Sequence, residues 1–381
     1  MTVRRQVWFM RVTVVVPEGF DDPARPSGGN HYDRRVCAAL AEAGWDVAVS
    51  TVAGAWPDPA PDARAGLARI LSAVPDGGSV LIDGLIASPA AAQLLPHSGR
   101  LRITVLLHMP LATAPGAQHD ASAQYSERAV LQAAACVVVT SEWTRRQVLA
   151  RYEIPARRVH VAHPGVDPVT APARPVRGHL ICVGVLAHHK GQDLLVQALA
   201  GLAEQDWQCV LAGSLDRDPH FVEHVRDRIS NLRYGHRIRL TGVLTGTQLS
   251  EAYATADLLV APSRSETYGM TVTEALAHGL PVIAAAVGGL PEALGTTPDG
   301  ARPGQLVPPG DPAALAAALG QWLGDERHRL RLRAAARERR LTLCGWDQTA
   351  REIALCLGPA PVGAHGGGVQ AQEEQEGARR R

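Results

Sequence analysis

The chain has 381 residues, of which 46% are hydrophobic and 20% charged. This length favours two domains, and the composition is that of a folded protein that buries large cores. A net charge of +1 gives no basic field of the kind that a nucleic-acid partner requires. All but one of the 38 basic residues are arginine, and the exception is Lys190. Codon bias explains the arginines, so the surviving lysine is a candidate functional residue.

The first half of the chain alternates β-rich runs with amphipathic helical segments. We expect strands at residues 11–16, 45–50, 80–83, 101–107, 136–140 and 159–162, and helices between them, one at residues 32–43. These strands are continuously apolar, which is typical of parallel strands covered on both faces. Residues 167–178 contain three prolines and predict a linker.

The alternation restarts after this linker. We expect strands at residues 180–185, 208–212, 238–241, 258–261 and 282–285, and helices at 192–204, 221–231, 249–255 and 272–278. Two such halves predict an α/β protein with two doubly wound, Rossmann-like domains facing across a cleft. The expected divisions are a first domain at 1–168, a linker at 169–178, a second domain at 179–344, a final helix at 345–358 and a disordered tail at 359–381.

The loop and helix after the strand at 258–261 carry the densest functional pattern. Free N–H groups at Gly269–Thr271, where the helix opens, would favour an anion such as phosphate. Glu266 and Glu274 are eight residues apart, and each carboxylate can accept two hydrogen bonds from vicinal hydroxyls. This spacing suits a phosphorylated sugar. The alternative is that both acids only complement the helix dipole.

This segment resembles the E-x7-E motif of retaining glycosyltransferases with the two-domain GT-B fold, specifically glycosyltransferase family 4. The similarity extends over nearly the whole chain, through segments at 27–29, 158–167, 183–199, 279–292 and 304–311. The resemblance implies transfer of a sugar from a UDP- or GDP-linked donor to an unidentified acceptor, with retention of configuration and with no metal or other cofactor. It also implies that the final helix crosses back to the first domain.

The resemblance implies roles for five residues on the donor side. Glu266 would bind hydroxyls of the transferred sugar, and Glu274 the ribose hydroxyls of the nucleotide. Gly269 and Met270 would offer backbone amides to the diphosphate. Lys190 would neutralise that diphosphate as it leaves, because stabilising charge that develops in the transition state is commonly the largest catalytic effect.

On the acceptor side, Gly28 and Gly29 resemble the family's glycine-rich loop. The resemblance places His108, at the end of a strand, near the reacting sugar, although a histidine there can also be an ordinary core residue. His31 and Asp33 could contact the acceptor.

The chain departs from the family pattern at Val185, where relatives usually carry a second, arginine ligand of the diphosphate. His188, His189 or Arg264 could take its place, or the diphosphate could be held by less charge. The Asp216–Asp218 pair forms an Asp-x-Asp pattern that binds metal in other glycosyltransferases. Here it precedes a proline and a helix, so helix capping explains it and we expect no metal site.

We favour same-face attack by the acceptor, and double displacement through Glu266 is the mechanistic alternative. The alternative functions are a UDP-sugar epimerase of the same fold and a non-catalytic sugar- or nucleotide-binding protein. No signal peptide or long apolar run is visible, which predicts a cytoplasmic protein without a transmembrane segment, and peripheral contact with a membrane stays open. The six scattered cysteines predict buried free thiols.

Overall fold

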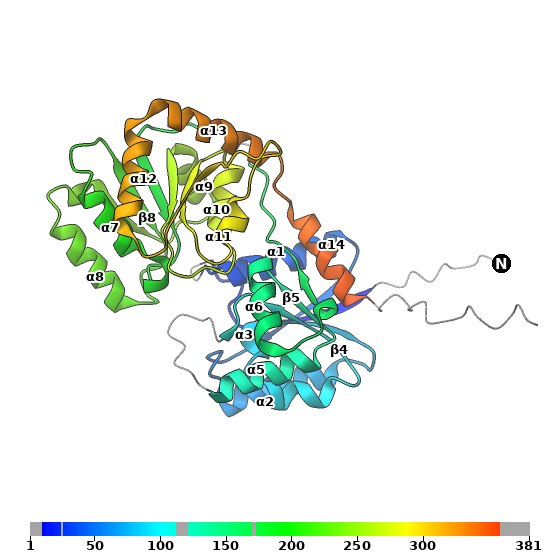
Figure 1. Cartoon of the computed structure of the whole chain (residues 1–381). Coiled ribbons are helices and arrows are strands. Elements are labelled where there is room, and N and C mark those ends of the chain that lie inside the picture. Colours follow the sequence, from blue (N-terminus) through cyan, green and yellow to red (C-terminus); the bar gives the residue numbers. More distant parts are fainter. Residues whose placement is uncertain (1–9, 24–25, 112–120, 170–172, 359–381) are drawn as a thin grey trace, which may run out of the picture.

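The computed structural model describes residues 10–23, 26–111, 121–169 and 173–358. The tail predicted to be disordered, residues 359–381, lies outside the described residues. Two α/β halves lie one above the other in Figure 1, and each is built around its own parallel sheet of six strands. The strands of the first sheet come from residues 11–161 and those of the second from 179–307. The predicted α/β class, with two doubly wound sheets, is confirmed.

The first sheet has the strand order β2-β1-β3-β4-β5-β6. Its strands are β1 (Arg11–Pro17), β2 (Asp46–Val52), β3 (Ser79–Asp83), β4 (Arg102–Leu107), β5 (Cys136–Val139) and β6 (Val159–Val161). Its helices are α1 (Gly28–Glu42), α2 (Pro61–Ala73), α3 (Gly84–Ala87), α4 (Ala91–Leu94), α5 (Ala121–Ala133) and α6 (Glu142–Tyr152), with 3-10 turns η1 (Leu95–His97) and η3 (Ala156–Arg158). Every residue of β5 is buried, as its unbroken apolar run predicts.

The second sheet has the strand order β12-β11-β10-β7-β8-β9. Its strands are β7 (His179–Val183), β8 (Gln208–Ala212), β9 (Ile238–Gly242), β10 (Leu258–Ala261), β11 (Val282–Ala285) and β12 (Gly304–Val307). The helices are α7 (Gln192–Ala200), α8 (Pro219–Ser230), α9 (Gly246–Thr255), α10 (Met270–Ala277), α11 (Leu290–Leu294), α12 (Pro312–Gly324) and α13 (Glu326–Arg340), with 3-10 turns η4 (His188–Lys190) and η5 (Gly235–Arg237).

This strand order is that of a Rossmann sheet. All strands are parallel, but the order in which the chain adds them changes direction between the neighbouring strands β7 and β10. Ligands of such sheets bind where the order reverses, outside the carboxyl ends of the strands. The loops that follow β7 and β10 therefore border the expected ligand crevice. These loops contain Lys190 and Glu266.

The last helix, α14 (Trp346–Leu357), follows the helices of the second sheet in the chain but packs on the first sheet (Figure 1). Trp346, Ile353 and Leu357 are buried in one apolar cluster with Tyr32 and Leu40 of α1. This helix therefore adds a covalent and an apolar connection between the two halves. Trp346, at the start of the helix, is buried and anchors this packing.

Two of the helices that begin earlier than the sequence predicts, α1 and α8, do so because a capping side chain lies further upstream. The helix expected at 32–43 begins at Gly28, since the hydroxyl of Ser27 accepts a hydrogen bond from the Asn30 amide at 3.0 Å. Gly28 and Gly29 therefore form the first turn of α1, so their assignment to a loop was wrong. Asp218 caps α8 by accepting from the Phe221 amide at 3.1 Å, as its position before a proline predicts.

All six cysteines are free. Four are buried, whereas Cys37 is half-buried and Cys344 is exposed, so the prediction of buried thiols is correct for four of them. Within the described ranges, no helix has both the length and the apolar character needed to cross a bilayer.

Candidate active site

Lys190 and Glu266 meet at the carboxyl edge of the second sheet. Lys190 ends the 3-10 turn η4, and its Nζ donates to Glu266 Oε2 at 2.5 Å. The side chains are 22% and 15% exposed, respectively, so the ion pair is partly shielded from water. Gly191 has a φ of +71°, and a Cβ there would lie 2.2 Å from the Pro262 carbonyl oxygen. Only glycine therefore lets the loops after β7 and β10 approach closely enough to form this pair.

The backbone around Glu266 is held by the turn before α11. The Gly289 amide donates to the Glu266 carbonyl at 3.1 Å. A Cβ on Gly288 would lie 1.7 Å from the same oxygen, so this close approach also requires glycine. The segment Val287–Leu290 thus supports the loop that carries the first glutamate of the E-x7-E motif.

The second glutamate lies on α10, whose amino end faces the crevice. The cap residue Gly269 has a φ of +106° and no side chain, so within the described chain no side-chain cap occupies the first amides of this helix. Glu274 is half-buried and accepts a hydrogen bond from the Tyr253 hydroxyl at 2.8 Å. Burial raises the pKa of Glu274 to about 7, against the opposing effect of the Tyr253 bond and with a further contribution from the charge of Asp167.

The arginine proposed to replace the missing diphosphate ligand is already paired. Arg264 binds both carboxylate oxygens of Asp193 at 2.7 Å and donates to the His188 carbonyl at 2.9 Å. Burial and the charge of Lys190 lower the pKa of His189 to about 4, so its imidazole is neutral near pH 7. Neither residue presents a free positive charge in this structure. Lys190 is paired as well, but through a single contact with Glu266.

His108 belongs to a buried acidic cluster on the first sheet. Its Nε2 lies 2.9 Å from Asp33 Oδ1. One carboxylate oxygen from each of Asp33 and Asp83 and one ring nitrogen of His108 all lie within 4.8 Å of one another. Burial alone would lower the pKa of His108, but the charge and hydrogen bond of Asp33, together with the charge of Asp83, raise it to about 9. Burial, with the charge of Asp33, raises the pKa of Asp83 to about 7. His108 is therefore an imidazolium at neutral pH.

The two halves of the crevice meet at the amino ends of α1 and α10. A Cβ on Gly28 would lie 3.7 Å from the sulfur of Met270, and Met270 packs against apolar clusters of both halves. The backbone of Gly29 lies against the His108 ring. His31 has its ring edge on Trp346, with the ring centroids 5.6 Å apart. The acceptor-side residues therefore lie directly opposite the amino end of α10.

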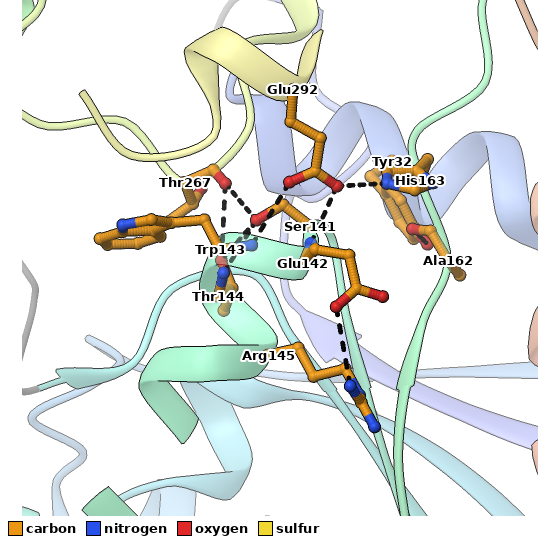
Figure 2. Close-up of polar contacts among 10 residues, drawn as sticks. All are labelled: Tyr32, Ser141, Glu142, Trp143, Thr144, Arg145, Ala162, His163, Thr267 and Glu292. Carbon is orange, nitrogen blue, oxygen red and sulfur yellow. Dashed lines mark hydrogen bonds and ion pairs between the residues drawn. The ribbon is translucent and has the colours of Figure 1, made fainter. Parts of the chain in front are cut away.

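Polar contacts connect the halves beside Glu266, and Figure 2 shows them. The Ser141 hydroxyl, from the amino end of α6, donates to the Thr267 carbonyl at 2.6 Å. Glu292 of α11 accepts from the amides of Glu142 at 2.9 Å and Trp143 at 3.3 Å. We call the contacts of Ser141 with Thr267 and of Glu292 with α6 the interdomain latch.

His163 completes the latch, because its Nε2 lies 2.5 Å from Glu292 Oε1. Burial alone would raise the pKa of Glu292, but hydrogen bonds from His163 and the two α6 amides hold it below its ordinary value. Glu292 thus remains ionised and satisfies the free amino end of a helix from the opposite half.

Comparisons with known proteins identify the family. The model described as "Glycosyltransferase Family 4" matches residues 26–169, and the model described as "Glycosyl transferases group 1" matches residues 175–339. The chain belongs to glycosyltransferase family 4. A protein named D-inositol 3-phosphate glycosyltransferase from Kineococcus radiotolerans is 32% identical over 248 residues, which are 59% of this chain and 57% of that protein. The protein of the same name from Xylanimonas cellulosilytica is 34% identical over 244 residues, with the same two shares.

The solved structures that resemble this chain share the GT-B fold. Sucrose-phosphate synthase from Thermosynechococcus elongatus has a TM-score of 0.72 and 24% identity, and the match covers 91% of this chain and 97% of that one. HepE of Anabaena, solved in complex with UDP-glucose, also has a TM-score of 0.72, at 18% identity, with coverage of 91% and 98%. At this identity the likeness concerns the fold. The chain spans less than two thirds of the length of the curated relatives above.

The structure brings together the residues that the family-4 resemblance assigned to the donor. Lys190 contacts Glu266, and Gly269, Met270 and Thr271 begin the helix that carries Glu274. Arg264 lies in the same loop, but its guanidinium faces Asp193. The roles of these residues, and of Gly28, Gly29, His31 and His108 on the other side, stay predictions.

The sequence reading missed the latch and the partners of two site residues. Glu292 ends one of the segments that resemble the family, but nothing local showed that it or Ser141 meets the opposite half. Asp193 and Asp83 were also missed. Asp83 is the last residue of the apolar strand β3, and a carboxylate at the end of a parallel strand was the signal that could have identified it.

Proposed function

We propose that this protein is a retaining, metal-independent glycosyltransferase that moves a sugar from a nucleoside-diphosphate sugar to an acceptor hydroxyl. The observation that carries the proposal is the Lys190–Glu266 pair beside the uncapped amino end of α10. A diphosphate bound there would meet an ammonium and several free amides. The glutamate released from Lys190 would then be available to the hydroxyls of the sugar.

The proposed reaction exchanges one bond for another at the anomeric carbon. The acceptor oxygen forms a bond to this carbon on the face from which the diphosphate oxygen leaves. The acceptor proton passes to a leaving phosphate oxygen, so the charge that develops on the diphosphate falls beside Lys190. Glu266 forms an ion pair with Lys190 in this structure, and in this scheme it would bind sugar hydroxyls.

The protonated His108 supports the acceptor side of the proposal. An imidazolium that faces the crevice can donate a hydrogen bond to a sugar oxygen but cannot act as a general base. This is consistent with a mechanism in which the leaving phosphate, rather than a side chain, receives the acceptor proton. The pair Asp33 and Asp83 would hold the ring in that charged state.

The relatives suggest which substrates to test first. HepE was solved with UDP-glucose, so UDP and its sugars are the first donor candidates, with GDP and its sugars as the comparison. The curated relatives are named for D-inositol 3-phosphate, which makes inositol phosphates the first acceptor candidates. The acceptor is otherwise open.

The deciding experiment has two stages. First, UDP or GDP should raise the melting temperature of the wild-type protein, because a ligand that binds only the folded state stabilises it. Glu274→Ala should abolish that shift while the unliganded protein still melts cooperatively. Second, NMR of the product should show the donor's anomeric configuration, with activity that persists after treatment with EDTA.

Three results would contradict the proposal. An inverted product would exclude retention, and trapping a glycosyl–Glu266 adduct would exclude same-face attack. Conversion of the donor without any acceptor would instead indicate the epimerase.

A further inference from the structure

A cavity of about 280 Å³ lies at the opposite edge of the second sheet from the Lys190–Glu266 pair. Its walls include Ala256 and Asp257, which precede β10, and Gly279–Pro281, which precede β11. Helix α13 closes one side. Because these segments come before the strands and the crevice comes after them, the cavity is separate from the proposed donor site.

Three arginines of α13 line this cavity: Arg333, Arg337 and Arg340. Their spacing of four and three residues places them on one face of the helix, where like charges repel one another. Arg333 pairs with Asp257, and Arg340 donates to the Val169 carbonyl. By contrast, Arg337 makes no hydrogen bond or ion pair with any residue that the structure describes.

The cavity therefore carries uncompensated positive charge. Asp257 is the one acidic residue among the described residues that line it, and it already accepts from Arg333 and from the Gly178 amide at 3.0 Å. Three arginines against one aspartate leave an excess of two positive charges. Such an excess in a concave site attracts anions.

A buried histidine adds an unsatisfied polar atom to the same cavity. His278 is 8% exposed, and its Nδ1 lies 2.9 Å from the Glu274 carbonyl oxygen, which fixes Nδ1 as the protonated nitrogen. Its Nε2 is buried without a hydrogen-bond partner in the described chain. Buried polar atoms without partners are uncommon in folded proteins, and a polar ligand is one explanation for such an atom. Because Nδ1 carries the proton, Nε2 is an acceptor, so it would bind a hydroxyl of the ligand's organic part and not its phosphate.

The remaining wall is apolar. Leu280, Pro281 and Ala256 are buried beside the arginines, and Pro175 of the linker closes the opposite side. Inorganic phosphate alone would leave this surface unused. A phosphate ester of a small organic molecule would place its charge on the arginines and its carbon skeleton on the apolar wall.

We propose that this cavity is a binding site for a small organic phosphate, with Arg337 as its principal ligand and with Arg340, Arg333 and His278 at its border. The site does not depend on the proposed transferase activity, because none of its residues touches the Lys190–Glu266 pair. It is connected to the donor side through α10, since His278 contacts the Glu274 backbone at the end of that helix.

Titration calorimetry on the full chain tests the site with two probes, inorganic phosphate and glucose 6-phosphate. The same titrations in Lys190→Ala separate this cavity from the donor crevice, which also attracts phosphate. Both probes should bind the Lys190→Ala variant with wild-type affinity, and glucose 6-phosphate should bind more tightly than inorganic phosphate.

Arg337→Gln should weaken glucose 6-phosphate binding by about tenfold, the effect of losing one charge-assisted hydrogen bond. The matched control is Arg327→Gln, an exposed arginine of the same helix outside the cavity, which should change the affinity by less than about twofold. Both variants should melt as the wild type does, because neither guanidinium makes a hydrogen bond or ion pair with a described residue.

The proposal fails if Lys190→Ala abolishes binding, which would assign the phosphate to the donor crevice. Equal losses of glucose 6-phosphate affinity in Arg337→Gln and Arg327→Gln would show that the ligand responds only to the overall positive charge of the helix, which would also overturn the proposal. Equal affinities for the two probes would exclude the organic part of the ligand, and the absence of binding in the wild type would exclude the site.

Discussion

Removing the carboxylate of Glu292 should open the crevice by releasing the interdomain latch. This side chain is 25% exposed and accepts two amide hydrogen bonds from the amino end of α6. Hydrogen bonds to a charged acceptor contribute about 1.5–3 kcal/mol, and those with groups exposed to water contribute less. The His163 contact adds little, because that ring is 44% exposed.

We therefore expect Glu292→Ala to weaken the contact between the halves by about 2 kcal/mol, a change of about thirtyfold in the closed-to-open ratio. Hydrogen exchange of the Glu142 and Trp143 amides reports the loss of these two bonds, since the substitution removes their acceptor. Small-angle scattering should show a larger radius of gyration if the halves separate. The Ser141–Thr267 bond remains, so the variant should still fold.

The matched control is Glu142→Gln, which removes a carboxylate from the same end of α6. Glu142 pairs at 3.7 Å with Arg145 of its own helix and does not reach across the crevice with its side chain. It should leave the exchange of the Trp143 amide and the radius of gyration unchanged. Wild-type exchange in Glu292→Ala, or equal exchange in both variants, would refute the latch.

The latch also predicts a dependence on pH. Because the pKa of Glu292 is lowered in the folded protein, its stabilising contribution is complete above the unfolded value of about 4.3. The contribution is lost as the pH falls through the lowered folded pKa. Glu292→Gln should remove this acid-induced component from the exchange of the two α6 amides.

Three further predictions concern single residues. Lys190→Ala should lower kcat by about a hundredfold or more, because the leaving diphosphate loses its cation, and an unchanged kcat and KM would remove Lys190 from the site. Asp33→Asn should bring the pKa of His108 down from about 9, as measured by NMR, since the carboxylate that raises it is lost; an unchanged value would contradict the assigned cause. Gly191→Ala should lower the free energy of unfolding by about 2 kcal/mol or more in denaturant titrations, because its new Cβ meets the Pro262 carbonyl at φ +71°; wild-type stability would show that the two loops move apart freely.

The strands of both sheets were predictable from the sequence because each is marked by a short local run of apolar residues. The strands expected at 258–261 and 282–285 have the observed limits. Both are short apolar runs; the first lies between Asp257 and Pro262, and the second begins directly after Pro281. The limits of helices were less accurate. The helix expected at 192–204 ends at Ala200, because the next residue is Gly201, which has low helix propensity and is the C-cap.

The donor loops were predictable for a similar reason, since strand ends place Lys190 and Glu266 at one edge of the sheet. Contacts between the halves were not. Ser141 and Thr267 are 126 residues apart, and Glu292 and Glu142 are 150 apart. A hydroxyl that accepts from Thr144 in its own helix gives no local sign that it also donates to a carbonyl of the other half.

The pairing of Arg264 also required the structure, and it explains why this loop uses both kinds of cation. The planar guanidinium of Arg264 forms a fixed bidentate bond with Asp193 and a third bond with the backbone of η4. It supports the turn on which Lys190 sits. Lys190 instead makes one contact through a compact ammonium on a flexible stem, so it can leave Glu266 for a phosphate oxygen without dismantling the turn.

Lys190→Arg is therefore the informative substitution at the one lysine of this chain. A guanidinium at this position would keep the positive charge. Its rigid planar fork binds best in one fixed bidentate geometry, whereas the phosphate group moves away from the sugar during the reaction. We expect Lys190→Arg to bind the donor nucleotide almost as well as wild type and to turn over at least about tenfold more slowly. Full turnover in this variant would show that any cation suffices, and the lysine would then be one more product of codon bias.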